Sequence, residues 1–289
     1  MSHLIAVTGA TGGVGSRVAA HLADRGIAQR LIVRDTARAP QLAGAEVKEV
    51  AGYHDHAAVL DALRGVRTLF MVSARESANR VTEHTSVVNA AVEAGVQRIV
   101  YTSSLGASPD ATFTFARDHF ATEEHIRATA LAFTFLRDSL YLELVPMFAS
   151  VEGVIAGPAG DGRIAWVSRD DVAEVAEAVL TGADHDGQTY DVTGPEARNL
   201  TYAAEQLSKF SGRPVTYRNE SLEEAYASRS SYGAPQFEVD GWVTSYACIA
   251  TGEMDIVSDT IPRLTGHVAQ SLPEYLATHP DSYAHLRHV

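Results

Sequence analysis

Four glycines follow a short apolar run near the start of the chain. Leu4–Val7 is followed by glycines at 9, 12, 13 and 15, and Val14–Ala23 then has amphipathic helical spacing. In a dinucleotide-binding loop the first glycine permits a tight turn, the second lets backbone N–H groups approach a pyrophosphate, and the third lets the helix pack close to the strand. The helix N-terminus adds unpaired donors and a partial positive charge. The run therefore predicts a dinucleotide site, with an ordinary glycine-rich turn as the alternative.

Strand-like and helix-like segments alternate strictly over the first 140 residues. Short, nearly continuous apolar runs are typical of strands buried on both faces. They occur at 4–7, 30–33, 47–50, 68–72, 98–102 and 133–137, and helical spacing occupies 13–26, 56–65, 79–95 and 117–130. The alternation predicts an α/β fold with a doubly wound parallel sheet, the Rossmann fold.

The rhythm changes after residue 138. We expect a NAD(P)-binding domain over 1–138 and a smaller α/β substrate lobe over 139–289 that is interwoven with the first. In the lobe the sequence predicts a helix over 138–150, a turn over 153–162, a helix over 169–182, a strand over 188–192 and helices around 201–211 and 221–228. The histidine-rich segment 279–289 lacks metal-ligand spacing and is interpreted as a surface tail.

The charge and hydropathy of the chain limit the classes of partner that it can bind. The 289 residues carry 23 basic and 36 acidic side chains, a formal charge of −13, which disfavours nucleic acid and anionic membranes as partners. No apolar run approaches the roughly 18 residues of a membrane span, the N-terminus lacks a basic leader, and Cys248 is the single cysteine. We expect a cytoplasmic protein that binds a small molecule, and a homo-oligomer is left open.

Several stretches carry a resemblance to a known family. They read TGATGGVG, LIVRDTARA, RIVYTSSLGA, HFATEE, WVSRDDVAEVAEAVL, GQTYDVTGPE and WVTSYACIATGEM. The chain resembles the NmrA-like group of atypical short-chain dehydrogenases/reductases, nearest to its bacterial NAD(P)H:quinone oxidoreductases. The resemblance implies a Rossmann fold and hydride transfer from a nicotinamide cofactor.

The end of the second strand indicates which dinucleotide is bound. An acidic residue there accepts hydrogen bonds from a ribose 2′-OH, whereas an arginine pairs with a 2′-phosphate. The strand ends at Arg34, and Arg38 offers a second charge, while Asp35 is discordant. We therefore expect NADP(H) rather than NAD(H), with a solvated surface arginine as the alternative. Similar proteins often read Gly-Asp-Tyr after the third strand; Ala51-Gly52-Tyr53 stands here, which leaves Tyr53 to stack near the adenine.

The usual proton donor of short-chain dehydrogenases is missing. These enzymes use a serine after the fifth strand and a Tyr-x-x-x-Lys pair in which the lysine lowers the tyrosine pKa. Aligning HFATEE places Phe115 at the tyrosine and His119 at the lysine, and no tyrosine lies between 102 and 140. A quinone accepts hydride readily and gives a weakly basic anion, so a quinone reductase can work without that tyrosine. The resemblance implies that His119 touches the nicotinamide ribose; a partly buried helix histidine is the alternative.

The predicted site follows from these assignments. His119 is the candidate catalytic residue, the aromatic residues expected at the substrate are Phe115, Tyr141 and Phe148, and no metal is expected. The cofactor is expected to contact Gly9, Thr11, Gly12, Gly13, Val14, Arg34, Tyr53, Ser73, Thr102, Ser103 and His119.

Two acidic positions are interpreted as helix caps rather than as sites. His54, Asp55 and His56 point apart on a turn, so Asp55 is expected to cap a helix, and Ser168-x-x-Asp171 has the form of a capping box. Two functions remain open: an NADPH-dependent quinone reductase, and a non-catalytic NADP-binding redox sensor of the NmrA type.

Overall fold

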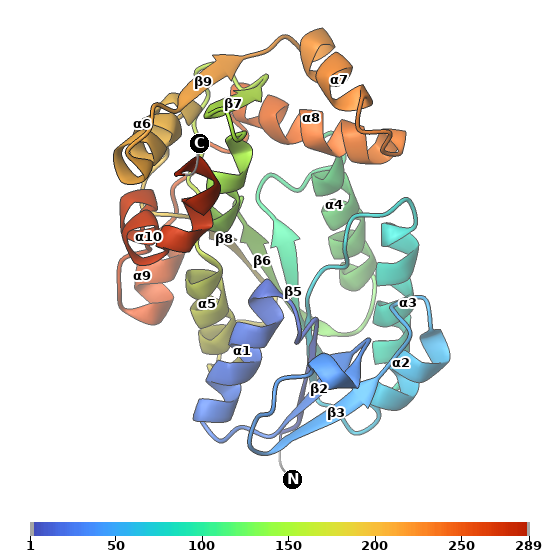
Figure 1. Ribbon diagram of the computed structural model, residues 1–289. Coiled ribbons are helices and arrows are strands. Elements are labelled where there is room, and N and C mark those ends of the chain that lie inside the picture. The colour runs from blue at the N-terminus through green and yellow to red at the C-terminus, as the bar shows by residue number, and fades with distance from the viewer. Residues whose placement is uncertain (1–2, 288–289) are drawn as a thin grey trace. The chain divides into compact units, whose positions relative to one another are not determined.

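A seven-stranded sheet forms the framework of the protein (Figure 1). The computed structural model describes residues 3–287. The strand order is β3-β2-β1-β4-β5-β6-β8, and β1 pairs in parallel with both β2 and β4. The strands are β1 (Ile5–Thr8), β2 (Gln29–Val33), β3 (Ala45–Glu49), β4 (Thr68–Met71), β5 (Arg98–Ser104), β6 (Ala132–Asp138) and β8 (Gln188–Val192). This order confirms the predicted doubly wound α/β fold.

Helices alternate with the strands as the sequence predicts. They are α1 (Gly13–Asp24), α2 (His56–Leu63), α3 (Arg80–Glu93), α4 (Thr114–Arg127) and α5 (Arg169–Thr181), followed by α6 (Leu200–Ser211), α7 (Leu222–Ser230), α8 (Gln236–Ala250), α9 (Thr260–Thr265) and α10 (Leu272–Thr278). Gly26, Gly65 and Gly95 follow three of them with φ of 67°, 76° and 79°. This left-handed conformation is the one that terminates a helix and favours glycine.

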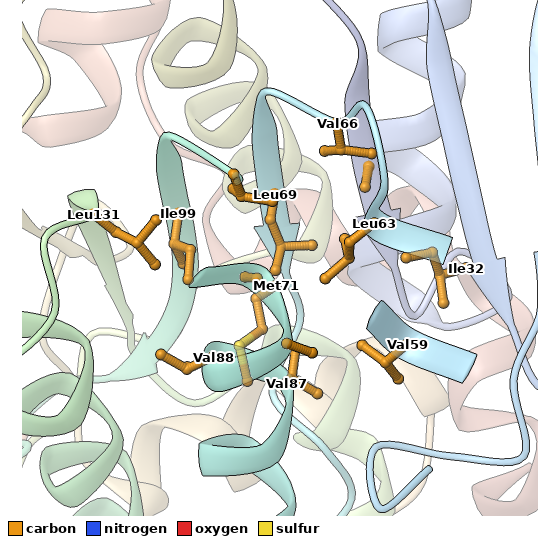
Figure 2. Packing of buried hydrophobic residues seen from close by; sticks show 14 of the residues in the cluster. Ile32, Val59, Leu63, Val66, Leu69, Met71, Val87, Val88, Ile99 and Leu131 are labelled. Carbon is orange, nitrogen blue, oxygen red and sulfur yellow. The ribbon is translucent and has the colours of Figure 1, made fainter. Parts of the chain in front are cut away.

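One hydrophobic core lies between the sheet and helices α2 and α3. Leu69, Met71 and Ile99 from the strands meet Val59, Leu63, Val87 and Val88 from the helices (Figure 2). Helix α1 lies on the other side of the sheet (Figure 1). There the Gln29 side chain donates to the Ala19 carbonyl of α1 at 2.7 Å. Helices thus cover both faces, which explains the continuous apolar runs of the inner strands. The edge strand β3 is mostly exposed, so the expectation of a strand buried on both faces is wrong there.

The turn between β1 and α1 is closed by backbone contacts that exclude side chains. Gly9 has φ 62°, and its carbonyl accepts from the Gly12 N–H at 2.8 Å. A Cβ on Gly15 would overlap the Gly9 carbonyl and lie 2.9 Å from the Thr8 oxygen. Glycine at 9 and 15 is therefore required by conformation and by close approach, as expected.

The chain divides into two compact units, each built from three segments. Unit 1 comprises residues 1–107, 118–137 and 172–190, and unit 2 comprises 108–117, 138–171 and 191–289. Unit 2 contains a second, two-stranded sheet in which β7 (Val154–Gly157) pairs in parallel with β9 (Thr216–Asn219). The predicted boundary at 138/139 stays a prediction. No helix in the described part of the chain is long and apolar enough to cross a membrane.

Three local predictions after residue 138 are wrong. Instead of a helix, 138–150 forms 3-10 turns at Leu142–Leu144 and Pro146–Phe148, because Pro146 lacks an N–H and the Leu142 N–H bonds to Val167. The expected turn over 153–162 contains β7. The expected surface tail forms a 3-10 helix over Pro280–Leu286 with Tyr283 and Leu286 buried; residues 288–289 lie outside the described part.

Both predicted helix caps are confirmed. The Asp55 carboxylate accepts from the Ala58 N–H at 3.2 Å and so caps α2. The Ser168 hydroxyl accepts from the Asp171 N–H at 3.0 Å at the start of α5, and the Asp171 carboxylate accepts from Ser168 and from the Gln270 N–H. Each of these side chains therefore accepts a hydrogen bond from a backbone N–H group.

Gly15→Ala tests the close packing of the turn. The added methyl group has to displace backbone atoms of Thr8 and Gly9, so we expect a loss of about 1–3 kcal/mol in the free energy of unfolding. Ser16→Ala, one residue along the same helix turn, is the control. Urea titrations that give the two variants equal stability would contradict this account of the turn.

Candidate cofactor and substrate site

The strand order reverses between β1 and β4. Ligands of doubly wound sheets bind at the carboxyl ends of the strands at this point. Tyr53 closes this edge: its Oη lies 2.6 Å from both Thr8 Oγ1 and the Val72 carbonyl. Burial raises the pKa of Tyr53 well above its usual value, so the hydroxyl stays protonated. Because the hydroxyl is held by the protein, only the ring of Tyr53 remains for an adenine.

Among residues 3–287, no side chain caps the backbone donors in the first turn of α1. Gly12 is the N-cap and supplies no side-chain hydrogen bond, and no acidic residue lies in the first turn. Gly12 and Gly13 are exposed, Thr11 is half-buried and Val14 is buried. A pyrophosphate supplies the acceptors and the negative charge that such a helix end lacks. The glycine loop therefore fits a dinucleotide.

Arg34 follows β2 as an exposed side chain. Among residues 3–287, no hydrogen bond or ion pair holds its guanidinium. The neighbouring Asp35, which the sequence left discordant, caps a short turn at Thr36–Arg38 by accepting from the Ala37 N–H at 2.9 Å. The acidic side chain thus has a structural partner, while the arginine is available to a 2′-phosphate.

The residues at the ends of β4 and β5 are tied to one another and to α4. The Ser73 N–H donates to Thr102 Oγ1 at 2.8 Å. Ser103 donates its hydroxyl to Glu123 Oε1 at 2.6 Å, and Arg137 binds the same fully buried carboxylate at 2.7 and 2.9 Å. The Ser103 hydroxyl therefore already donates its proton to a hydrogen bond within the protein. Its contact with a cofactor stays a prediction.

Both ring nitrogens of His119 have partners inside the protein. Nε2 lies 3.1 Å from Arg80 Nη2, and Nδ1 lies 2.9 Å from the Tyr101 hydroxyl. A guanidinium only donates, so Nε2 accepts and the ring proton resides on Nδ1. Burial, then the charge of Arg80, lowers the pKa of His119 well below its usual value. The buried imidazole is neutral, and its contact with a nicotinamide ribose stays a prediction.

A buried polar network continues from His119 to His84, and the sequence analysis did not predict it. His84 is fully buried; its Nε2 accepts from the Ala74 N–H at 2.8 Å, and its Nδ1 lies 2.9 Å from Thr122 Oγ1. Burial, then the charge of Arg80, lowers the pKa of His84 to about 3. A signal was present: Arg80 and His84 share the buried face of α3 with its core valines. Charged and imidazole groups on an apolar helix face indicate a buried polar network.

The three aromatic residues expected at the substrate all belong to unit 2. The Phe115 ring lies where a Cβ on Gly241 would be, and Phe148 lies 5.5 Å from the Tyr246 ring. Tyr141 donates to Asp138 Oδ2 at 3.0 Å. Within the described residues no ring contact joins Phe115, Tyr141 and Phe148 to one another. The described residues contain no group of three or more His, Cys, Asp or Glu side chains that could hold a metal ion.

The buried histidines predict a loss of stability in acid. Their folded-state pKa values lie below the unfolded value near 6.5, so stability is complete above about pH 6.5 and falls as pH decreases toward 3. With up to about 1.4 kcal/mol per histidine and pH unit, we expect roughly 2–4 kcal/mol less stability at pH 5 than at pH 7. Urea unfolding of His84→Asn should show a smaller pH dependence, and the exposed His267→Asn the full one; equal slopes would contradict this assignment.

Comparison with known proteins places the chain in a family. The model of the NmrA-like family matches residues 1–235. Quinone oxidoreductase 2 of Escherichia coli is 38% identical over 94% of this chain and 96% of its own length. The NAD(P)H azoreductase of Xenophilus azovorans is 30% identical over 97% and 99%.

A solved structure matches over nearly the whole chain. It is NADPH-dependent quinone oxidoreductase QOR2 from Escherichia coli in complex with NADPH, with a TM-score of 0.86 and 36% identity over 95% of this chain and 99% of that one. Family and fold both agree with the expectation from the sequence. The chain belongs to the NmrA-like family.

Proposed function

We propose that the chain is an NADPH-dependent oxidoreductase that reduces a quinone. The observation that carries this proposal is the uncapped glycine loop together with Arg34 after β2, whose guanidinium has no hydrogen bond or ion pair in the described part of the chain. The full-length similarity to a quinone oxidoreductase and an azoreductase supports the reductase activity and the small-molecule substrate. A cytoplasmic location stays a prediction.

Different residues of unit 1 bind different parts of the cofactor. The N–H groups of Gly13 and Val14 hold the pyrophosphate, Arg34 pairs with the 2′-phosphate, and Tyr53 offers its ring to the adenine. When bound, NADPH supplies hydride. His119 is too deeply buried and too weakly basic to exchange a proton near neutral pH, so its role is to fix the position of the nicotinamide ribose.

A quinone is a suitable substrate for a chain that has Phe115 at the position of the usual tyrosine. Hydride addition to a quinone produces a stabilised hydroquinone anion, whereas an aliphatic ketone produces a strongly basic alkoxide that needs an acid at once. The aromatic side chains Phe115, Tyr141 and Phe148 of unit 2 are suited to a flat conjugated ring. No specific observation favours the alternative of a non-catalytic redox sensor.

Steady-state NADPH oxidation tests the reaction itself. With NADPH and a panel of benzoquinones and naphthoquinones, the purified protein should consume NADPH and form hydroquinone in equal amounts, much faster than it reduces cyclohexanone. Boiled protein is the control. NADPH binding without turnover of any quinone would contradict the enzyme and favour the sensor.

Arg34→Ala tests the choice of cofactor. Removing a charge-assisted hydrogen bond of roughly 1.5–3 kcal/mol should weaken NADPH binding about tenfold to a hundredfold and leave NADH binding nearly unchanged. The matched control is Arg64→Ala, an exposed arginine of unit 1 that pairs with Asp61. Fluorescence titrations in which both cofactors lose affinity equally would exclude Arg34 as the partner of the 2′-phosphate.

A further inference from the structure

We propose that Arg80 is a positioning residue of the cofactor site, because its guanidinium joins the Ala74 carbonyl after β4 to the His119 ring on α4. This inference rests on the proposed function and deepens it, since it names the group that fixes His119 and, through His119, the nicotinamide ribose. All three residues belong to unit 1.

The guanidinium connects the two elements through two separate nitrogens. Arg80 Nε donates to the Ala74 carbonyl at 2.9 Å, and Nη2 donates to His119 Nε2 at 3.1 Å. Arg80 is the first residue of α3 and is 3% exposed, so both bonds are shielded from water. A planar guanidinium holds two acceptors at fixed relative positions, whereas a lysine ammonium on a flexible chain does not. The Arg80 bridge therefore fixes the His119 ring relative to the end of β4.

The segment that follows β4 is itself held by side chains. The Ser73 N–H donates to Thr102 Oγ1 at 2.8 Å, and the Ala74 N–H donates to His84 Nε2 at 2.8 Å. Arg80 binds the carbonyl of the same alanine, so both polar backbone groups of Ala74 are bound by side chains of α3. The carboxyl end of β4 belongs to the ligand-binding edge of the sheet. The Arg80 bridge thus ties His119 to a fixed part of that edge.

Packing alone does not account for a charged side chain at this position. A cation at the N-terminus of a helix is opposed by the helix dipole. The Asp118 carboxylate lies 4.0 Å from Arg80 Nη1, and within residues 3–287 Nη1 has no hydrogen-bond partner. Burial of a charge without a hydrogen-bonded counter-ion costs free energy, and an apolar side chain would avoid that cost. The charge is therefore explained by the two acceptors that it joins.

The bond from Arg80 also determines the chemical state of His119. Because Nη2 donates to Nε2, the ring keeps its proton on Nδ1, which donates to the Tyr101 hydroxyl at 2.9 Å. The groups that face the ring are Arg80 and His84 from α3 and Tyr101 from β5. Burial, then the charge of Arg80, lowers the pKa of His119. The ring is a neutral group held from two sides, which suits it to positioning rather than to proton transfer.

Arg80→Met and Arg80→Lys test the bridge through turnover and binding. Both variants should lower kcat for quinone reduction about tenfold to a hundredfold, since an error of about 1 Å at the reacting group has an effect of this size. Both should bind adenosine 2′,5′-bisphosphate, which has the adenine half of NADPH and no nicotinamide, as tightly as the wild type does. The lysine variant keeps the charge and loses the bridge, so it should not restore kcat.

The matched control is Arg98→Met. Arg98 is a half-buried arginine of unit 1 that begins β5 and donates to the Val179 carbonyl at 3.1 Å, away from the carboxyl ends of the strands. Its replacement removes a comparable side chain and should keep the wild-type kcat.

A double-variant cycle separates positioning through His119 from general packing. If Arg80 acts through His119, Arg80→Met should cost little further kcat in a His119→Gln background, so the two losses should not be additive. Additive losses, a wild-type kcat in Arg80→Met, or an equal loss of affinity for the bisphosphate overturns the inference.

Nitrogen-15 NMR of the imidazoles tests the contact without turnover, with His119→Gln identifying the signal. Wild-type His119 should carry its proton on Nδ1 and stay neutral from about pH 5 to 8. Arg80→Met should raise the pKa of His119, because the charge that lowers it is removed, and Arg98→Met should not. An Nε2–H tautomer in the wild type overturns this inference and leaves the proposed function intact. A wild type with the Nδ1–H tautomer that reduces no quinone overturns the proposed function, and with it the role of the bridge in placing the nicotinamide.

Discussion

The close approach of α1 to the end of β1 is the constraint on which the rest of the site depends. No side chain fits at Gly15 between the helix and the carbonyl groups of Thr8 and Gly9. This packing directs the first turn of α1, with its uncapped donors, toward the carboxyl edge of the sheet at the point where the strand order reverses. The same contact that shapes the core therefore also shapes the proposed anion site.

The two units contain buried polar groups of opposite chemical character. In unit 1, Arg80, His84 and His119 form a network in which burial keeps both imidazoles neutral and the hydrogen bonds fix their tautomers. In unit 2, burial raises the pKa of the Asp138 carboxyl, which accepts a hydrogen bond from the Tyr141 hydroxyl. The two buried imidazoles of unit 1 therefore hold fixed positions and exchange no proton near neutral pH.

The sequence predicted what is local and periodic. The strands, the helices up to residue 138, the Asp55 cap and the glycine loop follow from spacing and turn chemistry. Contacts between distant residues could not be predicted in this way. Tyr101 directly precedes the tyrosine-free interval after 102, and only the fold brings it beside His119. Strand β7 is hidden within a glycine- and proline-rich segment because its partner β9 lies some sixty residues later, at a separation that no local pattern reports.

The central claim is that backbone donors of the glycine loop hold the pyrophosphate of NADPH. Glycine-selective amide NMR spectra during a titration with NADPH test it most directly, since Gly12, Gly13 and Gly15 each contribute a signal. The account predicts a saturable shift and slower hydrogen exchange of the Gly13 amide, while distant glycines such as Gly212 remain unchanged. Saturable binding of NADPH that leaves the Gly13 signal in place would contradict it.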